Sequence, residues 1–180
     1  MFSGVQRPRR IIHGWRADAT CPKQKAAPAG LFAREVIDVG VVCSNVNKSV
    51  DFYTNAIGFT EIEGFDVTDQ FGGDSGLSQN EAFHVHVLNL VVGDKATRLK
   101  LMQFPNRPGK LTNQAFIHSS YGYSYLTIFV NDMNASLARA KKAGAAIVGK
   151  SPVIIRGGPN WLTLLRDPDG NFIELVGPKK

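Results

Sequence analysis

The chain has 180 residues, of which 43% are hydrophobic, so it can bury the core of one globular domain or of two small modules. Its formal net charge of +6 is concentrated in residues 1–33, where six Lys or Arg residues stand against Asp18 alone. The nearly neutral remainder argues against nucleic acid as a partner, and no apolar stretch reaches the roughly 20 residues that span a bilayer.

The basic segment 1–33 is rich in Ala and Pro and shows no sustained periodicity, so we expect it to be disordered. A transit peptide to an organelle is the alternative, but Ser is scarce and amphipathicity is weak. Only Cys21 and Cys43 are present, which indicates neither a disulfide framework nor a cysteine zinc site. We therefore expect a cytoplasmic protein, with an organellar location as the alternative.

A first structural unit is predicted over residues 34–104. A buried strand at 36–43 is followed by cap residues and by a helix whose apolar face holds Val50, Tyr53 and Ile57 and which ends at Gly58. Further strands are predicted at 59–67, 83–92 and 97–104, with the Gly-rich segment 64–82 as a loop between the second and third strands. The order is βαβββ.

The same order starts again after a Pro-containing linker, residues 105–121. The second unit, 122–178, is predicted to contain a strand at 123–130, a capped helix that ends at Gly144, strands at 145–149 and 161–166, the turn "DPDGN" and a strand at 172–176.

These two units form an internal repeat. A shift of 87 residues places Asp38 on Tyr125, and the closing stretch "RLKLMQF" matches "NFIELVG" with Lys100 on Glu174. Glu174, a carboxylate inside an apolar strand, therefore occupies a repeated structural position.

Three stretches, "VIDVGVVCSNVNKSVDFYTNAIGF", "GYSYLTIFVNDMNASLARAKKAGA" and "LLRDPDGNFIELVGP", make residues 34–178 resemble the vicinal oxygen chelate superfamily. That superfamily includes glyoxalase I, bleomycin-resistance proteins and extradiol dioxygenases. The resemblance implies an α+β fold in which two βαβββ modules form an incomplete curved β-barrel around a cleft. It also implies a possible homodimer, because modules of this family often complete their clefts across a two-fold axis or by pairing within one chain.

Enzymes of this family place a metal ligand on the first and last strand of each module, and the resemblance carries these positions onto Asp38, Lys100, Tyr125 and Glu174. The family usually has His or Gln on the first strand of a module and Glu on the last strand. Of the four positions, only Glu174 matches this pattern. Asp38 could serve as an oxygen ligand, but the Lys100 cation would repel a metal, and a Tyr phenol is a poor ligand. We expect these four residues to act as a catalytic cluster without a cofactor, in which Lys100 replaces the metal. The alternative is one divalent metal held by Asp38 and Glu174.

Strand alternation predicts which other side chains face the same cleft. Those expected to point inward are Gly40, Val42, Arg98, Met102, Tyr123, Thr127, Phe129, Phe172 and Val176. Of these, Tyr123, Thr127, Phe129, Arg98, Met102 and Phe172 are the candidate ligand-binding residues. An aromatic cleft with a charged floor is typical of a small-molecule site. The alternative is that the charged residues pair with one another in a buried cluster and that side chains fill the cleft.

Two other motifs carry possible chemistry. His84 and His86 share one face of a predicted strand and could bind a metal, but a solvent-facing or packed pair is the favoured interpretation. Cys43 ends a buried strand and is predicted to be a small core residue.

Three functions remain open. The first is a metal-free cleft that binds or transforms a small organic molecule, and this is the function we favour. The second is a metal-dependent lyase, isomerase or dioxygenase with an altered ligand set. The third is a non-catalytic module that mediates association.

Overall fold

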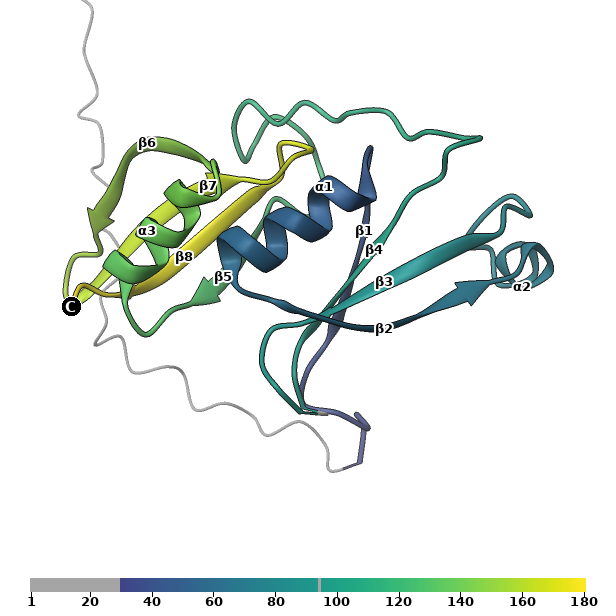
Figure 1. Ribbon diagram of the computed structural model, residues 1–180, viewed down its shortest axis with the longest axis horizontal. Helices are drawn as coiled ribbons and strands as arrows, with labels where there is room; N and C mark the ends of the chain where they lie inside the picture. The colour runs from purple at the N-terminus through teal and green to yellow at the C-terminus, as the bar shows by residue number, and fades with distance from the viewer. Residues whose placement is uncertain (1–29, 94) are drawn as a thin grey trace, which may run out of the picture.

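The computed structural model describes residues 30–93 and 95–180, so the expected disorder of residues 1–29 lies outside the described residues. The first module contains β1 (Asp38–Val42), α1 (Val46–Asp51), the π-helical segment η1 (Phe52–Ile57), β2 (Thr60–Val67), α2 (Asp69–Asp74), β3 (Phe83–Asn89) and β4 (Arg98–Met102) (Figure 1). The second contains β5 (Tyr125–Phe129), α3 (Met133–Lys142), β6 (Ala146–Ile154), β7 (Asn160–Arg166) and β8 (Phe172–Pro178).

Each module builds one four-stranded sheet, and the two sheets have the same topology. The strand orders are β1-β4-β3-β2 and β5-β8-β7-β6, with the first and last strands of each module as parallel neighbours and the other pairs antiparallel. The predicted α+β architecture of two βαβββ modules is therefore confirmed.

The strand register repeats as well. Gly40 pairs with Lys100 in the first sheet, and Thr127 pairs with Glu174 in the second. Gly40 lies two residues after Asp38, as Thr127 does after Tyr125. The first and last strands are therefore paired in the same register in both modules. The internal repeat predicted from the sequence is thus present in the pairing of the strands.

The ends of the helices follow from local chemistry. The side chains of Asn45 and Asp132 accept hydrogen bonds from backbone N–H groups of the first turns of α1 and α3. Gly58 ends η1 in a left-handed conformation with φ 101°, and Gly144 follows α3 with φ 74°. Both helix stops predicted from Gly are therefore in place.

One predicted loop contains a helix. β2 ends at Val67, as the predicted strand at 59–67 does, but α2 follows where the sequence predicted a loop, with Thr68 accepting a hydrogen bond from the N–H of Phe71. Gly72 and Gly73 lie inside α2, and glycine lowers helix propensity, which obscured the cap signal in the sequence.

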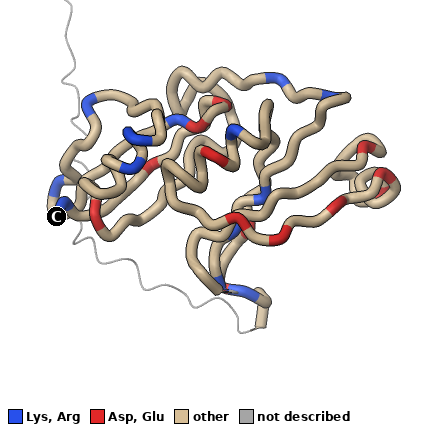
Figure 2. The backbone as a smooth tube through the Cα atoms, viewed as in Figure 1, with Lys and Arg blue, Asp and Glu red and all other residues tan. Residues whose placement is uncertain are grey.

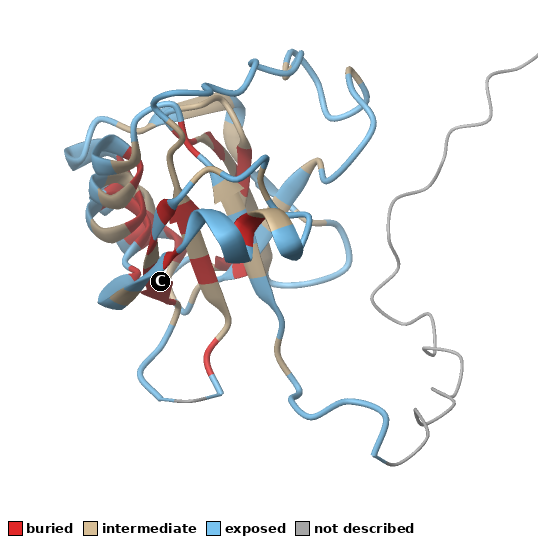
Figure 3. Ribbon diagram, turned by 90° about the vertical axis from the view of Figure 1, so that its right-hand side faces the viewer, coloured by how far each residue is buried: buried red, intermediate tan, exposed pale blue. Residues whose placement is uncertain are grey.

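Both modules share one hydrophobic core, because α1, η1 and α3 lie on the same side of the two sheets (Figures 1 and 3). Tyr53 and Ile57 of η1 belong to the same cluster of buried side chains as Leu165 and Leu175 of the second sheet. Arg139 of α3 donates to the carbonyl oxygens of Ala56 and Ile57 at 3.2 and 2.6 Å, which fixes the two helices against each other. The modules are therefore packed as one unit.

The opposite face of the first and fifth strands is open. Asp38, Gly40 and Val42 of β1 are exposed while the residues between them are half-buried, and β5 shows the same alternation. This open face is the one that the sequence assigns to the cleft. Among the described residues, no helix has the length and apolar character required to cross a membrane.

Candidate functional site

The four positions singled out in the sequence form two separate pairs. In the first sheet, the Lys100 ammonium lies 2.9 Å from Oδ2 of Asp38. In the second sheet, Glu174 accepts a hydrogen bond of 2.9 Å from the Thr127 hydroxyl, and Tyr125 lies two residues before Thr127 on β5. No hydrogen bond or ion pair within the described part of the chain joins the first pair to the second.

These side chains are a poor fit to a divalent metal ion. Asp38 is already neutralised by Lys100, and the ammonium would lie next to any cation that Asp38 bound. In residues 30–93 and 95–180, no group of three His, Cys, Asp or Glu side chains is placed to hold a metal ion. The donor set at the four positions therefore lacks the convergent oxygen and nitrogen ligands that a divalent ion requires.

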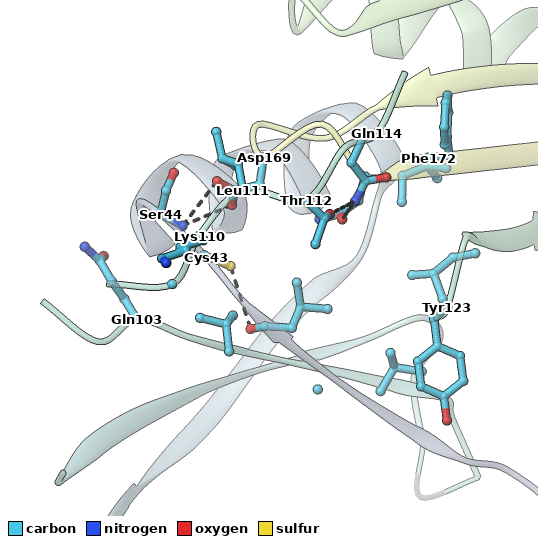
Figure 4. A pocket seen from close by; sticks show the side chains of 18 of the residues that line it. Cys43, Ser44, Gln103, Lys110, Leu111, Thr112, Gln114, Tyr123, Asp169 and Phe172 are labelled. Atoms are coloured by element: carbon cyan, nitrogen blue, oxygen red, sulfur yellow. Dashed lines mark hydrogen bonds between the residues drawn. The ribbon is translucent and has the colours of Figure 1, made fainter. Parts of the chain in front are cut away.

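A cavity of about 580 Å³ is lined by residues of β1 in the first module and of β5 in the second (Figure 4). This volume is within the range of small-molecule sites. The cavity is lined by residues 39–44, 53, 103–105, 108–112, 114, 123–126, 169 and 171–173. It thus combines backbone and side chains of both modules with the linker between them.

The linker is anchored over the cavity by side-chain hydrogen bonds. Gln114 donates to Oδ1 of Asn171 at 2.8 Å, and Arg166 donates to the carbonyl oxygen of Ala115 at 3.2 Å. At its start, Arg107 contacts Glu81 at 2.8 Å. These contacts hold the linker between residues 107 and 115, and this part of it forms a wall of the cavity.

The polar groups of the cavity come from three segments. The carboxylate of Asp169 accepts hydrogen bonds of 3.2 and 3.1 Å from the N–H of Ser44, and the Gln103 side chain accepts one of 3.0 Å from the N–H of Val46. Lys110 and Thr112 lie on the linker, where Figure 4 shows them near Asp169 and Gln114. A ligand here would meet amide, hydroxyl and carboxylate groups at one end of an apolar space.

Two ionisable groups at the inner wall are held neutral. Burial, followed by the neighbouring Asp167 carboxylate, raises the pKa of the Tyr53 phenol well above its ordinary value. Burial also raises the pKa of the Cys43 thiol, and Asp169 and Asp167 add to the effect. Neither group is suited to act as a nucleophile at neutral pH, which agrees with the prediction of Cys43 as a core residue.

Two of the six candidate ligand-binding residues, Tyr123 and Phe172, line this cavity, as does Tyr125 of the expected catalytic cluster. Phe172 is buried and lies under the guanidinium of Arg166, 4.2 Å from ring centroid to Cζ. The other expected residues lie elsewhere: Arg98 and Met102 on β4, where Met102 packs on the cluster around Phe83, and Thr127 and Phe129 further along β5. Asp38, Lys100 and Glu174 are also outside the cavity lining.

Sequence reasoning missed the lining residues that come from the linker and the turn, among them Gln103, Lys110, Thr112, Gln114, Asp169 and Asn171. Strand alternation identifies side chains only within strands, and all of these residues except Gln103 lie outside the predicted strands. Gln103 lies in the predicted strand at 97–104, but alternation assigned it to the face away from the cleft. The "DPDGN" turn was the one sequence signal that pointed to some of these residues. Asp and Asn side chains in a turn bond to the nearby backbone, so Asp169 and Asn171 could be expected at defined places between β7 and β8.

Comparison with known proteins places the fold in a family. The family model described as "Glyoxalase/Bleomycin resistance protein/Dioxygenase superfamily" matches residues 36–175. A curated protein of Vibrio cholerae described as "Probable lactoylglutathione lyase" is 24% identical over 136 residues, which cover 76% of this chain and 85% of that protein.

Solved structures agree with the fold. A glyoxalase family protein from Bacillus cereus superposes with a TM-score of 0.68 at 21% identity, covering 86% of this chain and all of the other. Glyoxalase I from Zea mays gives a TM-score of 0.60 at 16% identity, and the match covers 81% of this chain but only 45% of the maize chain.

Proposed function

The chain belongs to the Glyoxalase/Bleomycin resistance protein/Dioxygenase superfamily, and we propose that it binds or transforms a small organic molecule in a metal-free cleft. The observation that carries this proposal is the 580 Å³ cavity at the junction of the two modules, with the linker as one wall. An apolar space with a few polar groups at one end is the usual form of such a site.

In this proposal, Tyr125 connects the cavity to the open face of the sheets. It lines the cavity and is also half exposed on β5, on the same strand as Thr127. A ligand that extends past Tyr125 would approach Lys100, Asp38 and Glu174, which we propose as its charged partners. The Lys100 ammonium retains N–H groups beyond the one that faces Asp38, and these can donate charge-assisted hydrogen bonds to a ligand oxygen.

A thermal-shift screen of small organic molecules followed by calorimetry tests this function. Gly40 lines the cavity, and a Cβ at this position would meet only the Met102 side chain at 3.5 Å, so Gly40→Val adds bulk without a backbone clash. We expect Gly40→Val and Tyr125→Ala to weaken any hit. Val92→Ala is the matched control, because Val92 is 96% exposed and outside the lining. Equal binding by all variants would refute the cavity as the site.

A metal-dependent lyase is the second candidate, and the relative described as a probable lactoylglutathione lyase favours it. In this case Asp38 and Glu174 would hold the metal. Elemental analysis of the purified protein decides between the candidates. If one equivalent of a divalent metal is present and is lost in both Asp38→Asn and Glu174→Gln, the metal-free proposal is wrong.

A further inference from the structure

Two histidines lie on the face of the first sheet that is opposite to Lys100. They are His84 and His86, alternate residues of β3, so both point to the same side of the strand. The register pairs His86 with Leu101 and pairs Lys100 with Val87, which places His86 and Lys100 on opposite faces. Any site at the histidine pair is therefore separate from the open face and from the cavity between the modules.

Each histidine is oriented by a carboxylate of β2. Nδ1 of His84 lies 2.7 Å from Oδ1 of Asp66, and Nδ1 of His86 lies 2.8 Å from Oε1 of Glu61. An ionised carboxylate can only accept, so in each neutral ring Nδ1 carries the proton and Nε2 presents a lone pair. Histidines that ligate metals almost always donate the N–H of the second ring nitrogen to a carboxylate, a backbone carbonyl or water, and a carboxylate fills this role for both rings here.

The two rings are also close to each other and accessible. Their centroids are 4.9 Å apart with an interplanar angle of 80°, and the side chains of His84 and His86 are 48% and 27% exposed. The absence of a side chain at Gly64, inside the bulge of β2, leaves room for His84, because a Cβ there would lie 2.7 Å from Nε2 of His84 and 2.3 Å from the carbonyl oxygen of Val85. Nε2 of His84 therefore lies over the bulge, on the side of the ring that faces away from Asp66.

The surrounding charge favours a cation. Residues 59–93, which span β2, α2 and β3, contain six acidic residues and no Lys or Arg, although Glu81 is paired with Arg107 of the linker. Figure 2 shows these acidic positions along β2 and around α2, at the end of the first module. A cluster of one sign of charge raises the local concentration of ions of the opposite sign.

We propose that His84 and His86 bind one divalent transition-metal ion through their Nε2 atoms, with Asp66 and Glu61 as positioning residues. Imidazole nitrogen suits Zn²⁺, Cu²⁺ and Ni²⁺ rather than Mg²⁺ or Ca²⁺, which prefer oxygen ligands. No third His, Cys, Asp or Glu joins the pair within the described residues, so water completes the coordination. The site is thus expected to bind more weakly than a structural zinc site with four protein ligands.

Calorimetric titration of untagged, chelator-treated protein with Zn²⁺ and Ni²⁺ tests the proposal. We expect one saturable equivalent in the wild type, and its loss in His84→Gln and in His86→Gln. His118→Gln is the control, because His118 stacks on Phe116 in the linker. Asp66→Asn should keep the stoichiometry and weaken the affinity by about 10- to 100-fold, as the loss of an orienting partner does.

A second measurement covers variants that fold poorly. In wild-type protein labelled with ¹⁵N, addition of Zn²⁺ should shift the Nε2 resonances of His84 and His86 together, with the proton retained on Nδ1. The proposal is overturned if no saturable binding occurs, if the double variant His84→Gln/His86→Gln binds as well as the wild type, or if neither Nε2 resonance responds.

Discussion

The phenol of Tyr53 donates a hydrogen bond of 2.9 Å to Oδ2 of Asp167, and both residues are buried. Tyr53 belongs to η1 of the first module, while Asp167 opens the turn between β7 and β8 of the second. Oδ1 of Asp167 accepts from the N–H groups of Asp169 and Asn171, so the same carboxylate holds the turn that contributes to the cavity wall. This one contact links the packing of the modules to the shape of the candidate site.

Replacing Tyr53 by Phe should therefore destabilise the protein. The change removes a buried hydrogen bond to a charged group and leaves Asp167 with fewer partners, which corresponds to a loss of about 1–3 kcal/mol in the free energy of unfolding. Chemical denaturation followed by circular dichroism measures the loss. Thr54→Val is a suitable control, because the Thr54 hydroxyl bonds only to carbonyl oxygens of its own helix.

Tyr53 also predicts how stability depends on alkaline pH. Its pKa is raised in the folded protein, mainly by burial, so the unfolded chain loses the phenol proton first. The stabilisation by the protonated phenol is complete below the ordinary tyrosine pKa of about 10 and decreases as the pH rises above it. Between pH 9 and about 11, the wild type should lose stability more steeply than Tyr53→Phe. If the free energy of unfolding falls equally with pH in the wild type and in Tyr53→Phe, the Tyr53 phenol is not the group responsible.

Cys43 should react slowly with thiol reagents while the protein is folded. Burial raises the pKa of its thiol, and the thiolate is the reactive form. A Cys21→Ser background leaves Cys43 as the single thiol. We expect the rate of modification by a disulfide reagent to rise to that of a free thiol in denaturant. A fast reaction in native buffer would mean that the inner wall of the cavity opens readily.

The elements with a strong local signal were predictable from the sequence. Exposed and more buried side chains alternate along β1 and β5, as the period of two in a strand predicts. The helices end just before Gly58 and Gly144 because glycine readily adopts the left-handed conformation. The pairing of Lys100 with Gly40 and of Glu174 with Thr127 also matches the internal repeat. These features depend on neighbouring residues or on a repeated order, which a single sequence contains.

The site was less predictable, because it depends on contacts between distant segments. Gln114 and Asn171 are 57 positions apart, and only the folded linker brings them together. The cross-strand partners of His84 and His86 likewise depend on a bulge in β2. The bulge shifts the pairing of β2 with β3, and strand alternation alone does not predict such a shift.

The open face is expected to form a homodimer interface. It carries the apolar side chain of Phe129, which is 78% exposed, lies outside the cavity lining and would gain from burial. Light scattering coupled to size exclusion should give twice the mass of one chain, and Phe129→Asp should shift the equilibrium towards monomer. The control is Val92→Asp, which adds the same charge at a residue outside the open face. A wild-type monomer at micromolar concentration would exclude this interface.

The last prediction concerns the ion pair of Lys100 and Asp38, two of the positions that the sequence resemblance assigns to metal ligands. Lys100→Glu replaces the cation with a carboxylate, and it leaves Asp38 facing a second negative charge. Two carboxylates that face each other repel unless a proton or a cation lies between them, so the variant should bind Mn²⁺ where the wild type does not. Mn²⁺ favours oxygen ligands, and a His84→Gln/His86→Gln background removes the histidine pair as a competing site. Calorimetry in this background gives the result directly. Equal affinity for Mn²⁺ in the His84→Gln/His86→Gln protein with and without Lys100→Glu would show that Lys100 does not exclude the metal, and the metal-free cleft would have to be abandoned.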